Sequence, residues 1–171
     1  MGLHRFYHAD RELKLTEGQT IELDSRGLSR FGSVYWDAIH TVPIEKMNEA
    51  EQREFLLEQT RSLPVFMEHR PSRLQSLFGA ISIEDARRFV DTIVPKAVRT
   101  PIFEVFASSF STLDMNWLDY ASDPEMYIQN RRSYWYGEIS NHNPEIGDRK
   151  PPMLEVLMQL PVKVGKIIEW V

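Results

Sequence analysis

The sequence contains no cysteine among its 171 residues. This absence excludes a disulfide framework, a thiol nucleophile and a thiolate metal site, and it suits a reducing, cytoplasmic location. No apolar run approaches the ~20 residues that a membrane-spanning helix needs, and the opening "MGLHRFYHADRELK" has no apolar segment before a small-residue cleavage site. We therefore expect a soluble cytoplasmic protein without a membrane partner.

Motifs of several enzyme classes are also missing. The chain has no GxSxG motif of serine hydrolases and no glycine-rich phosphate loop of the GxxxxGK[ST] or GxGxxG kind. It has no HExxH motif and no EF-hand spacing. A helix would bring His4 and His8 together, but the residues around them predict a short strand, so we expect no metal site.

The composition is that of an ordinary globular protein. Hydrophobic residues make up 42% and charged residues 26% of the chain, and the length suits one domain over residues 1–171. The formal net charge of −5 argues against general adhesion to nucleic acid. A local basic patch is compatible with a negative total, so a nucleic-acid substrate stays open.

The first third of the chain predicts two strands, a loop and a helix. Residues 4–8, "HRFYH", and 19–23, "QTIEL", favour strands. Residues 25–33, "SRGLSRFGS", hold two glycines among small polar residues, which predicts a loop. Strong helix formers dominate residues 45–61 and predict a helix that Pro64 stops.

The middle of the chain predicts a strand that runs into a helix, followed by a hairpin. "LQSLFGA" is strand-like, and Ser82 with Asp85 three residues later resembles the start of a capped helix, "SIEDARRFVDT". The β-prone runs "PIFEVFASSF" and "TLDMNWL" then predict two strands paired as a hairpin.

The last third predicts a helix, a long loop and two strands. Asp123 as cap and Pro124 at the first position open a helix that extends to Trp135. Residues 139–152 lack an apolar period and predict a surface loop. The final residues favour two strands separated at Pro161. Helices are thus inserted among strands without strict alternation, which indicates an α+β domain.

Glu155 is the unusual residue of the final segment, "MLEVLMQL". In a strand it shares one face with Met153 and Leu157, so its surroundings are partly apolar. Such surroundings disfavour the charged form and can prepare a carboxylate for chemistry, although a solvated or ion-paired glutamate is the commoner case. Glu138, in "YWYGE", is a rival acid that we expect at the surface of a helix end.

Three segments in order carry a resemblance to a known superfamily. They are "FYHADR" on the first strand, "PSRLQSLFGAISIEDARRFV" in the middle and "MLEVLMQLPVKV" near the end. Their order resembles the ADP-ribosyltransferase fold, in which a His or Arg, an aromatic or Ser residue and a late Glu surround NAD. With "DMNWL" and "YWYGE", the chain is similar to an uncharacterised bacterial and phage family of small proteins in that superfamily.

The resemblance implies a split β-sheet core with inserted helices and a site for NAD as substrate. Loss of nicotinamide from the ribose creates positive charge that a carboxylate can stabilise, and Glu155 matches that acid. The residues that the resemblance implies are Glu155 and His8 as catalytic residues, and Tyr7, Arg11, Arg73, Ser76 and Phe78 as the NAD-binding residues. Family members with His on the first strand often carry Tyr where this chain offers Phe78 or Ser76.

Several of these residues have a plain structural interpretation as well. His8 fits a hydrogen-bonded structural histidine, and Phe78 fits a core position, because aromatic residues of central strands usually pack inward. Arg70 is a further candidate for the pyrophosphate. Arg131 and Arg132, beside two aromatic residues, suit either a nucleic-acid acceptor or, more simply, a solvated helix edge.

The leading functional hypothesis is therefore an NAD-dependent ADP-ribosyltransferase that modifies a macromolecule, protein or nucleic acid, in a toxin or phage-conflict setting. One alternative is a catalytically inactive binding module on the same scaffold, because a fold does not guarantee activity. A second is an NAD-dependent RNA 2′-phosphotransferase, a class that needs no terminal Glu.

Overall fold

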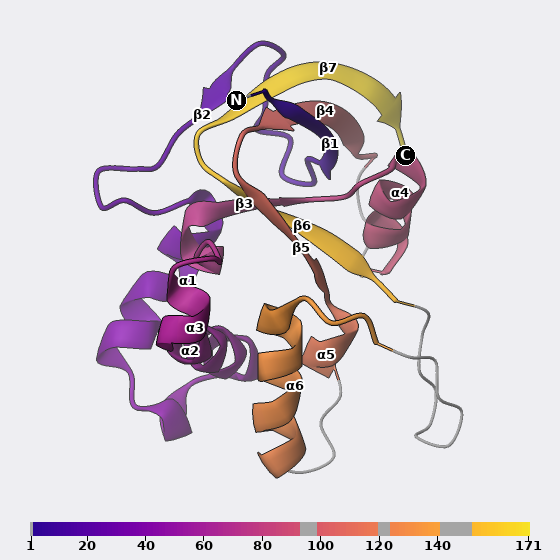
Figure 1. Cartoon of the computed structure of the whole chain (residues 1–171). Coiled ribbons are helices and arrows are strands. Elements are labelled where there is room, and N and C mark those ends of the chain that lie inside the picture. Colours follow the sequence, from indigo (N-terminus) through magenta and orange to yellow (C-terminus); the bar gives the residue numbers. More distant parts are fainter. Residues whose placement is uncertain (1, 93–98, 120–123, 141–151) are drawn as a thin grey trace.

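The computed structural model describes residues 2–92, 99–119, 124–140 and 152–171 and shows a mixed arrangement of helices and antiparallel strands (Figure 1). The strands in these ranges are β1 (His4–Ala9), β2 (Thr20–Ile21), β3 (Ser76–Gly79), β4 (Pro101–Ala107), β5 (Phe110–Asp114), β6 (Leu154–Gln159) and β7 (Val162–Trp170). The α-helices are α1 (Arg30–Thr41), α2 (Glu49–Arg61), α3 (Pro64–Met67), α4 (Ile83–Thr92), α5 (Asn116–Asp119) and α6 (Pro124–Tyr136), with 3₁₀ turns η1 (Ile44–Lys46) and η2 (Arg73–Gln75).

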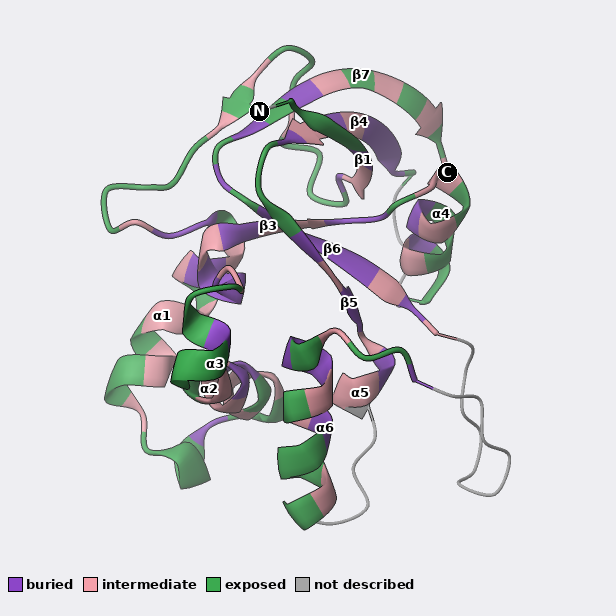
Figure 2. Cartoon of the chain, in the orientation of Figure 1, coloured by how far each residue is buried: buried purple, intermediate pink, exposed green. Residues whose placement is uncertain are grey.

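The strands form two sheets that share one core. The four-stranded sheet has the order β1-β4-β7-β2 and the three-stranded sheet the order β3-β6-β5, with antiparallel pairs throughout. Phe6 and Val105 of the first sheet belong to the same apolar cluster as Val156 and Met158 of the second. The buried residues of β4 and β6 in Figure 2 mark this core between the sheets.

Helices cover the outer faces of both sheets. Leu57 of α2 and Trp135 of α6 pack with Leu157 of β6 on the face of the three-stranded sheet that points away from the other sheet. Ala86 of α4 packs with Ile102 on the outer face of the four-stranded sheet. In Figure 1, α1, α2, α3 and α6 accordingly lie on one side of the three-stranded sheet, and α4 lies beside the C-terminus.

The predicted hairpin between "PIFEVFASSF" and "TLDMNWL" is wrong. Both runs contain strands, β4 and β5, but β4 pairs with β1 and β7 whereas β5 pairs with β6 in the other sheet. The two strands separate because their buried side chains have different partners: Val105 packs between the sheets and Leu113 packs against α2 and α6. The end of the second run forms a turn and α5 instead of strand.

The predicted loop over residues 25–33 is wrong in its second half, because α1 begins at Arg30. Ser29 caps this helix by accepting a hydrogen bond from the Gly32 N–H at 3.1 Å, and its own hydroxyl donates to the carbonyl oxygen of Leu74 at 3.1 Å. Of the two glycines that indicated a loop, Gly27 has a φ of +76° in a turn, whereas Gly32 lies inside the helix where α1 meets η2.

The other predicted elements are confirmed with small shifts of their ends. Ser82 accepts the Asp85 N–H at 3.1 Å in front of α4, and Asn48 with Glu51 forms a capping box in front of α2. The strands β6 and β7 flank Pro161. The predicted cap Asp123 and most of the predicted loop 139–152 lie outside the described residues.

The buried carboxylate of Asp114 fixes the start of β6. It accepts hydrogen bonds from the backbone N–H groups of Asn116, Ser140 and Met153, at 3.0, 2.7 and 3.1 Å, and from the Ser140 hydroxyl at 2.6 Å. Four donors compensate the burial of one charge.

No helix in the described ranges is long and apolar enough to cross a membrane.

We predict that Gly32→Ala destabilises the protein. A β-carbon at this position would stand 1.9 Å from the Leu74 carbonyl oxygen, a backbone atom that cannot rotate away. Alanine gains about 1 kcal/mol in helix propensity, but relief of the overlap requires α1 and η2 to separate, which costs about 3 kcal/mol or more. Urea unfolding should show a lower midpoint for this variant. Gly2→Ala is the control, because nothing lies within 4 Å of its added carbon, and it should change little.

Candidate functional site

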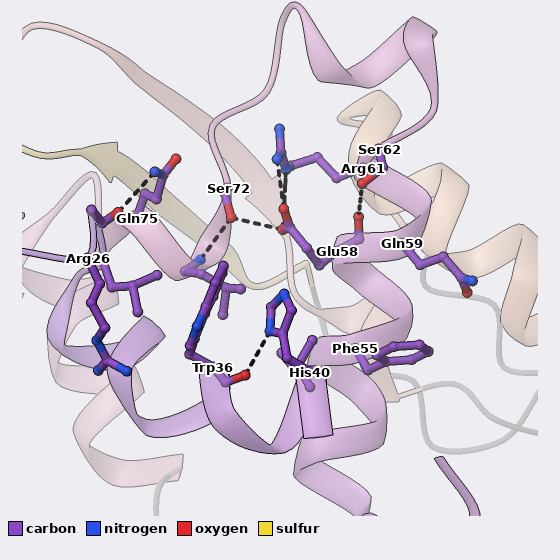
Figure 3. Close-up of a pocket in the computed structure, with 14 residues that line it drawn as sticks. Arg26, Trp36, His40, Phe55, Glu58, Gln59, Arg61, Ser62, Ser72 and Gln75 are labelled. Atoms are coloured by element: carbon purple, nitrogen blue, oxygen red, sulfur yellow. Dashed lines mark hydrogen bonds and ion pairs between the residues drawn. The ribbon is translucent and has the colours of Figure 1, made fainter. Parts of the chain in front are cut away.

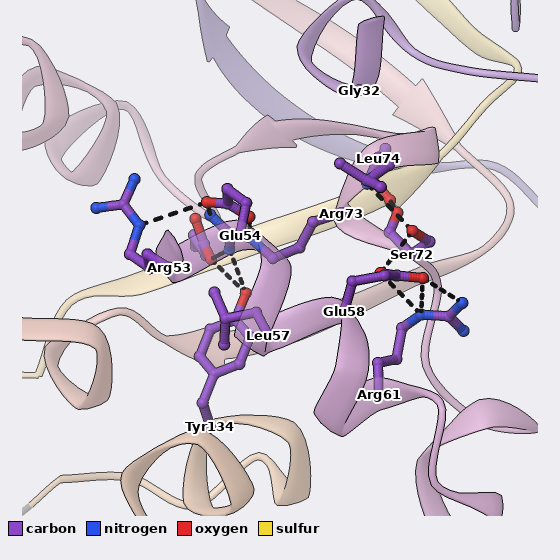
Figure 4. A network of polar contacts seen from close by, with 12 residues as sticks. Gly32, Arg53, Glu54, Leu57, Glu58, Arg61, Ser72, Arg73, Leu74 and Tyr134 are labelled. Atoms are coloured by element: carbon purple, nitrogen blue, oxygen red, sulfur yellow. Dashed lines mark hydrogen bonds and ion pairs between the residues drawn. The ribbon is translucent and has the colours of Figure 1, made fainter. Parts of the chain in front are cut away.

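A buried cluster of charged side chains is centred on Arg73 of η2 (Figure 4). Arg73 donates to Glu54 of α2 through Nε at 2.8 Å and through Nη2 at 3.1 Å. Its Nη1 donates to Oε1 of Glu155 on β6 and to the hydroxyl of Tyr134 on α6, and that hydroxyl donates to the same Glu155 oxygen. We call Glu54, Arg73, Tyr134 and Glu155 the Arg73 network. Their exposed fractions are 1%, 5%, 0% and 3%.

Local structure holds each member in place. Ser72 caps η2 by accepting the Leu74 N–H at 3.2 Å, and its hydroxyl donates to Glu58 of α2 at 2.9 Å. These bonds tie η2 to α2, which carries Glu54 one turn before Glu58. Glu155 projects from β6 on the same face as Leu157, the face that α2 and α6 cover.

The charges of the network are compensated within the protein. Burial alone lowers the pKa of Arg73, but the carboxylates of Glu155 and Glu54 raise it well above its ordinary value. Burial raises the pKa of Tyr134 well above its ordinary value, Arg73 opposes this shift, and the charge of Glu155 adds to it. Arg53, at 3.4 Å from Glu54, supplies a second positive charge at the exposed edge.

Aromatic rings complete the surroundings of the Arg73 guanidinium. Its central carbon lies 4.7 Å from the ring centroid of Phe78, 5.6 Å from that of Tyr134 and 5.7 Å from that of Phe31. Rings at this distance attract a cation through their quadrupole. The guanidinium therefore occupies an enclosed position with carboxylates at its edge and rings around it.

Three of the residues that the resemblance implied come together here: Arg73, Phe78 and Glu155. They meet as a closed, mutually paired group. The Glu155 carboxylate is in contact with Arg73 and Tyr134 and is almost fully buried.

His8 lies on the opposite side of the three-stranded sheet from Glu155. It shares a face of β1 with Phe6, which packs between the two sheets against Val156 and Met158. Glu155 alternates with Val156 on β6 and points to the helices instead. The His8 Nδ1 lies 2.5 Å from the carbonyl oxygen of Phe78, and because a carbonyl only accepts, Nδ1 carries the hydrogen. Burial is the main reason why the pKa of His8 is lowered from 6.5.

The remaining implied residues have other surroundings. Tyr7 is half-buried and packs with Ala86 beneath α4. Arg11 is exposed in the turn after β1. The Ser76 hydroxyl donates to the backbone carbonyl oxygen of Ser72 at 2.7 Å. The structure therefore does not gather these three side chains around Glu155.

No sequence pattern indicated Glu54, Phe31 or the role of Tyr134 in this network. Glu54 stands among the many charges of "EAEQREFLLEQ", and no pattern in that run separates a buried acid from the exposed ones.

The other candidates from the sequence lie elsewhere. Arg70, a candidate for the pyrophosphate, donates to the Trp135 carbonyl oxygen at 2.7 Å. Glu138 is exposed, as expected. Among the described residues, no cluster of three or more His, Asp or Glu could hold a metal ion.

A cavity of about 480 Å³ lies beside the Arg73 network, between α1, α2 and η2 (Figure 3). Neither Glu155 nor His8 lines it. Its lining residues are Arg26, Gly27, Leu28, Trp36, Ile39, His40, Phe55, Glu58, Gln59, Arg61, Ser62, Ser72, Leu74 and Gln75. Ser72 and Leu74 flank Arg73 in the sequence, so η2 separates the cavity from the network.

Comparison with known proteins adds no assignment. No protein-family model matches the chain, and no curated protein matches its sequence.

We predict that Arg73→Met destabilises the protein more than Glu155→Gln does. Loss of Arg73 leaves two carboxylates buried without their main cation, which costs about 3–5 kcal/mol. Glu155→Gln keeps the pair of Arg73 with Glu54 and an oxygen that accepts from Tyr134, so we expect about 1–3 kcal/mol. Urea unfolding measures both. Arg87→Met, which removes an exposed ion pair with Glu169, should change little; an equally small effect of Arg73→Met would contradict a structural role for the network.

We also predict that His8 makes the protein less stable in mild acid. Because its pKa is lowered in the folded state, the unfolded chain takes up the proton first as the pH falls. The stability that neutral His8 provides is complete above about pH 6.5 and is lost below it. Between about pH 7.5 and 5.5, His8→Asn should therefore lose less unfolding free energy than the native chain. The exposed His69→Asn should follow the native chain, and identical pH slopes for all three proteins would refute the prediction.

Proposed function

We propose that this chain is a ligand-binding domain on a split-sheet scaffold of the ADP-ribosyltransferase type, and that Glu155 stabilises the scaffold instead of acting on NAD. The observation that carries this proposal is the closed state of the Glu155 carboxylate: it is 3% exposed and paired with Arg73 and Tyr134. A catalytic acid needs the reacting ribose beside it in a defined geometry. Here the Arg73 guanidinium, and no open space, is the neighbour that Glu155 contacts.

The scaffold part of the proposal is supported by the two antiparallel sheets. One sheet carries the first strand, the other carries β3 and β6, and helices are inserted between β2 and β3 and between β5 and β6. The resemblance to ADP-ribosyltransferases implies a split β-sheet core with inserted helices, and two sheets with inserted helices are compatible with it. Both sheets contribute to one core, which keeps β3 and β6 in fixed positions.

The binding part of the proposal is supported by the cavity between α1, α2 and η2. Its volume of about 480 Å³ lies within the ~300–1,000 Å³ that small-molecule sites usually have. It combines apolar side chains, such as Leu28 and Phe55, with polar and charged groups, such as Gln75, that can orient a ligand. A domain that binds a ligand without catalysing a reaction needs such a cavity but no catalytic side chains.

A second candidate is transfer of ADP-ribose from NAD to a macromolecular acceptor. The observation in its favour is the meeting of Arg73, Phe78 and Glu155, three of the residues that the resemblance implied. This activity requires the Arg73 network to open, so that Glu155 exchanges Arg73 for the substrate. Opening separates a buried ion pair, which costs several kcal/mol unless the substrate compensates it.

The two candidates are separated by incubation of the purified protein with labelled NAD, with and without cell extract. We expect no loss of NAD and no transfer of label above the blank, for the native chain and for Glu155→Gln alike. NAD loss or label transfer by the native chain that disappears in a folded Glu155→Gln variant would overturn our proposal in favour of the transferase. Circular dichroism of both proteins establishes that the variant is folded.

A further inference from the structure

We propose that the cavity between α1, α2 and η2 binds a nucleotide, with an amino-substituted base stacked on Trp36 and the phosphate held by Arg26. This inference rests on the proposed function, because it takes the cavity as the binding site. Three features of the lining indicate the class of ligand: an aromatic face, a fixed hydrogen-bond acceptor and a weakly paired cation.

Trp36 supplies the aromatic face. The His40 ring lies 3.8 Å from the Trp36 ring, centroid to centroid, and its Nδ1 is 2.8 Å from the Trp36 carbonyl oxygen, which holds the imidazole in place. Figure 3 shows His40 on one side of Trp36, and Arg26 and Gln75 on the other. Because His40 covers one side of Trp36, a flat ligand would stack on the other side, and every nucleobase offers a face that suits it.

Gln75 supplies the fixed acceptor. Its Nε2 donates to the Gly27 carbonyl oxygen at 3.0 Å, which orients the amide and leaves Oε1 as the acceptor. The neighbouring lining side chains Leu28 and Leu74 are apolar. A purely hydrocarbon ring would leave this acceptor unpaired once water is expelled, whereas an exocyclic amino group satisfies it.

Arg26 supplies the cation. The other charged lining residues, Glu58 and Arg61, are paired with each other at 2.7 Å. Arg26 has two long and solvent-exposed ion pairs, at 3.8 Å to Asp24 and 3.6 Å to Asp37, which hold it weakly. A phosphate can replace them, because a guanidinium binds phosphate through two parallel hydrogen bonds.

The test is calorimetric titration of the native chain with adenosine monophosphate, adenosine and ribose 5-phosphate. We expect adenosine monophosphate to bind about fivefold more tightly than adenosine, because the phosphate adds one exposed charged contact. Ribose 5-phosphate, which has no base, should not bind at about 1 mM. Base stacking should also quench the fluorescence of Trp36, and this change should disappear in Trp36→Phe, which keeps a ring in place.

Arg26→Gln should abolish the preference for adenosine monophosphate over adenosine. Arg88→Gln is the matched control: Arg88 has the same side-chain exposure, 45%, and a similar ion pair of 3.7 Å, but lies on α4, and this variant should keep the preference. Absence of binding by both nucleoside ligands, or a preference that survives in Arg26→Gln, would overturn the inference. Neither result depends on Glu155, so failure here is distinct from NAD consumption in the previous experiment.

Discussion

The ion pairs that Arg73 forms with Glu54 and Glu155 are the interactions on which the rest of the helical side depends. They connect a helix, a 3₁₀ turn and a strand that lie far apart in the sequence, and Tyr134 adds α6 to the same group. Once η2 is fixed, its Leu74 carbonyl oxygen accepts both the N–H and the hydroxyl of Ser29. The start of α1 therefore docks on η2, and the cavity lies where α1, α2 and η2 meet.

Burial of these charges has a functional consequence. A buried ion pair is costly to form and costly to break, so the network holds one arrangement of α2, α6 and β6 and resists opening. The same residue types could hold NAD if space remained beside them. The position of the Arg73 guanidinium against Glu155, with Phe78 stacked on it, is the observation that supports our proposal of a binding scaffold over a transferase.

Sequence patterns predicted α2, α4 and α6 and the strand alternation, because these depend on near neighbours, but they missed α1, α3 and α5. The alternation of β6 correctly placed Glu155 and Leu157 on one face. Arg73 and Glu155, which the resemblance implied as site residues, are in contact as an ion pair. Patterns could not show that Glu54, 101 positions before Glu155, shares the same guanidinium, since this contact depends on how α2 packs. Nor could they show that the chain changes sheets between β4 and β5, because a short connection is equally compatible with a hairpin.

The same limit explains α1. Gly32 resembles a loop residue in the sequence, but it is required by the close approach of the helix to η2, which only the folded chain reveals. Local signals thus defined most elements, whereas the closed state of the candidate site and the cavity beside it arise from contacts between distant segments.

The most direct test of the central claim is a double-mutant cycle between Arg73 and Glu155, with each residue replaced by Met alone and together. If the two side chains are structural partners, the double variant should be more stable than the sum of the two single effects indicates, with a coupling energy of about 2–3 kcal/mol in urea unfolding. Additive effects, with Glu155→Met close to the native chain in stability, would contradict the claim and leave Glu155 available for chemistry.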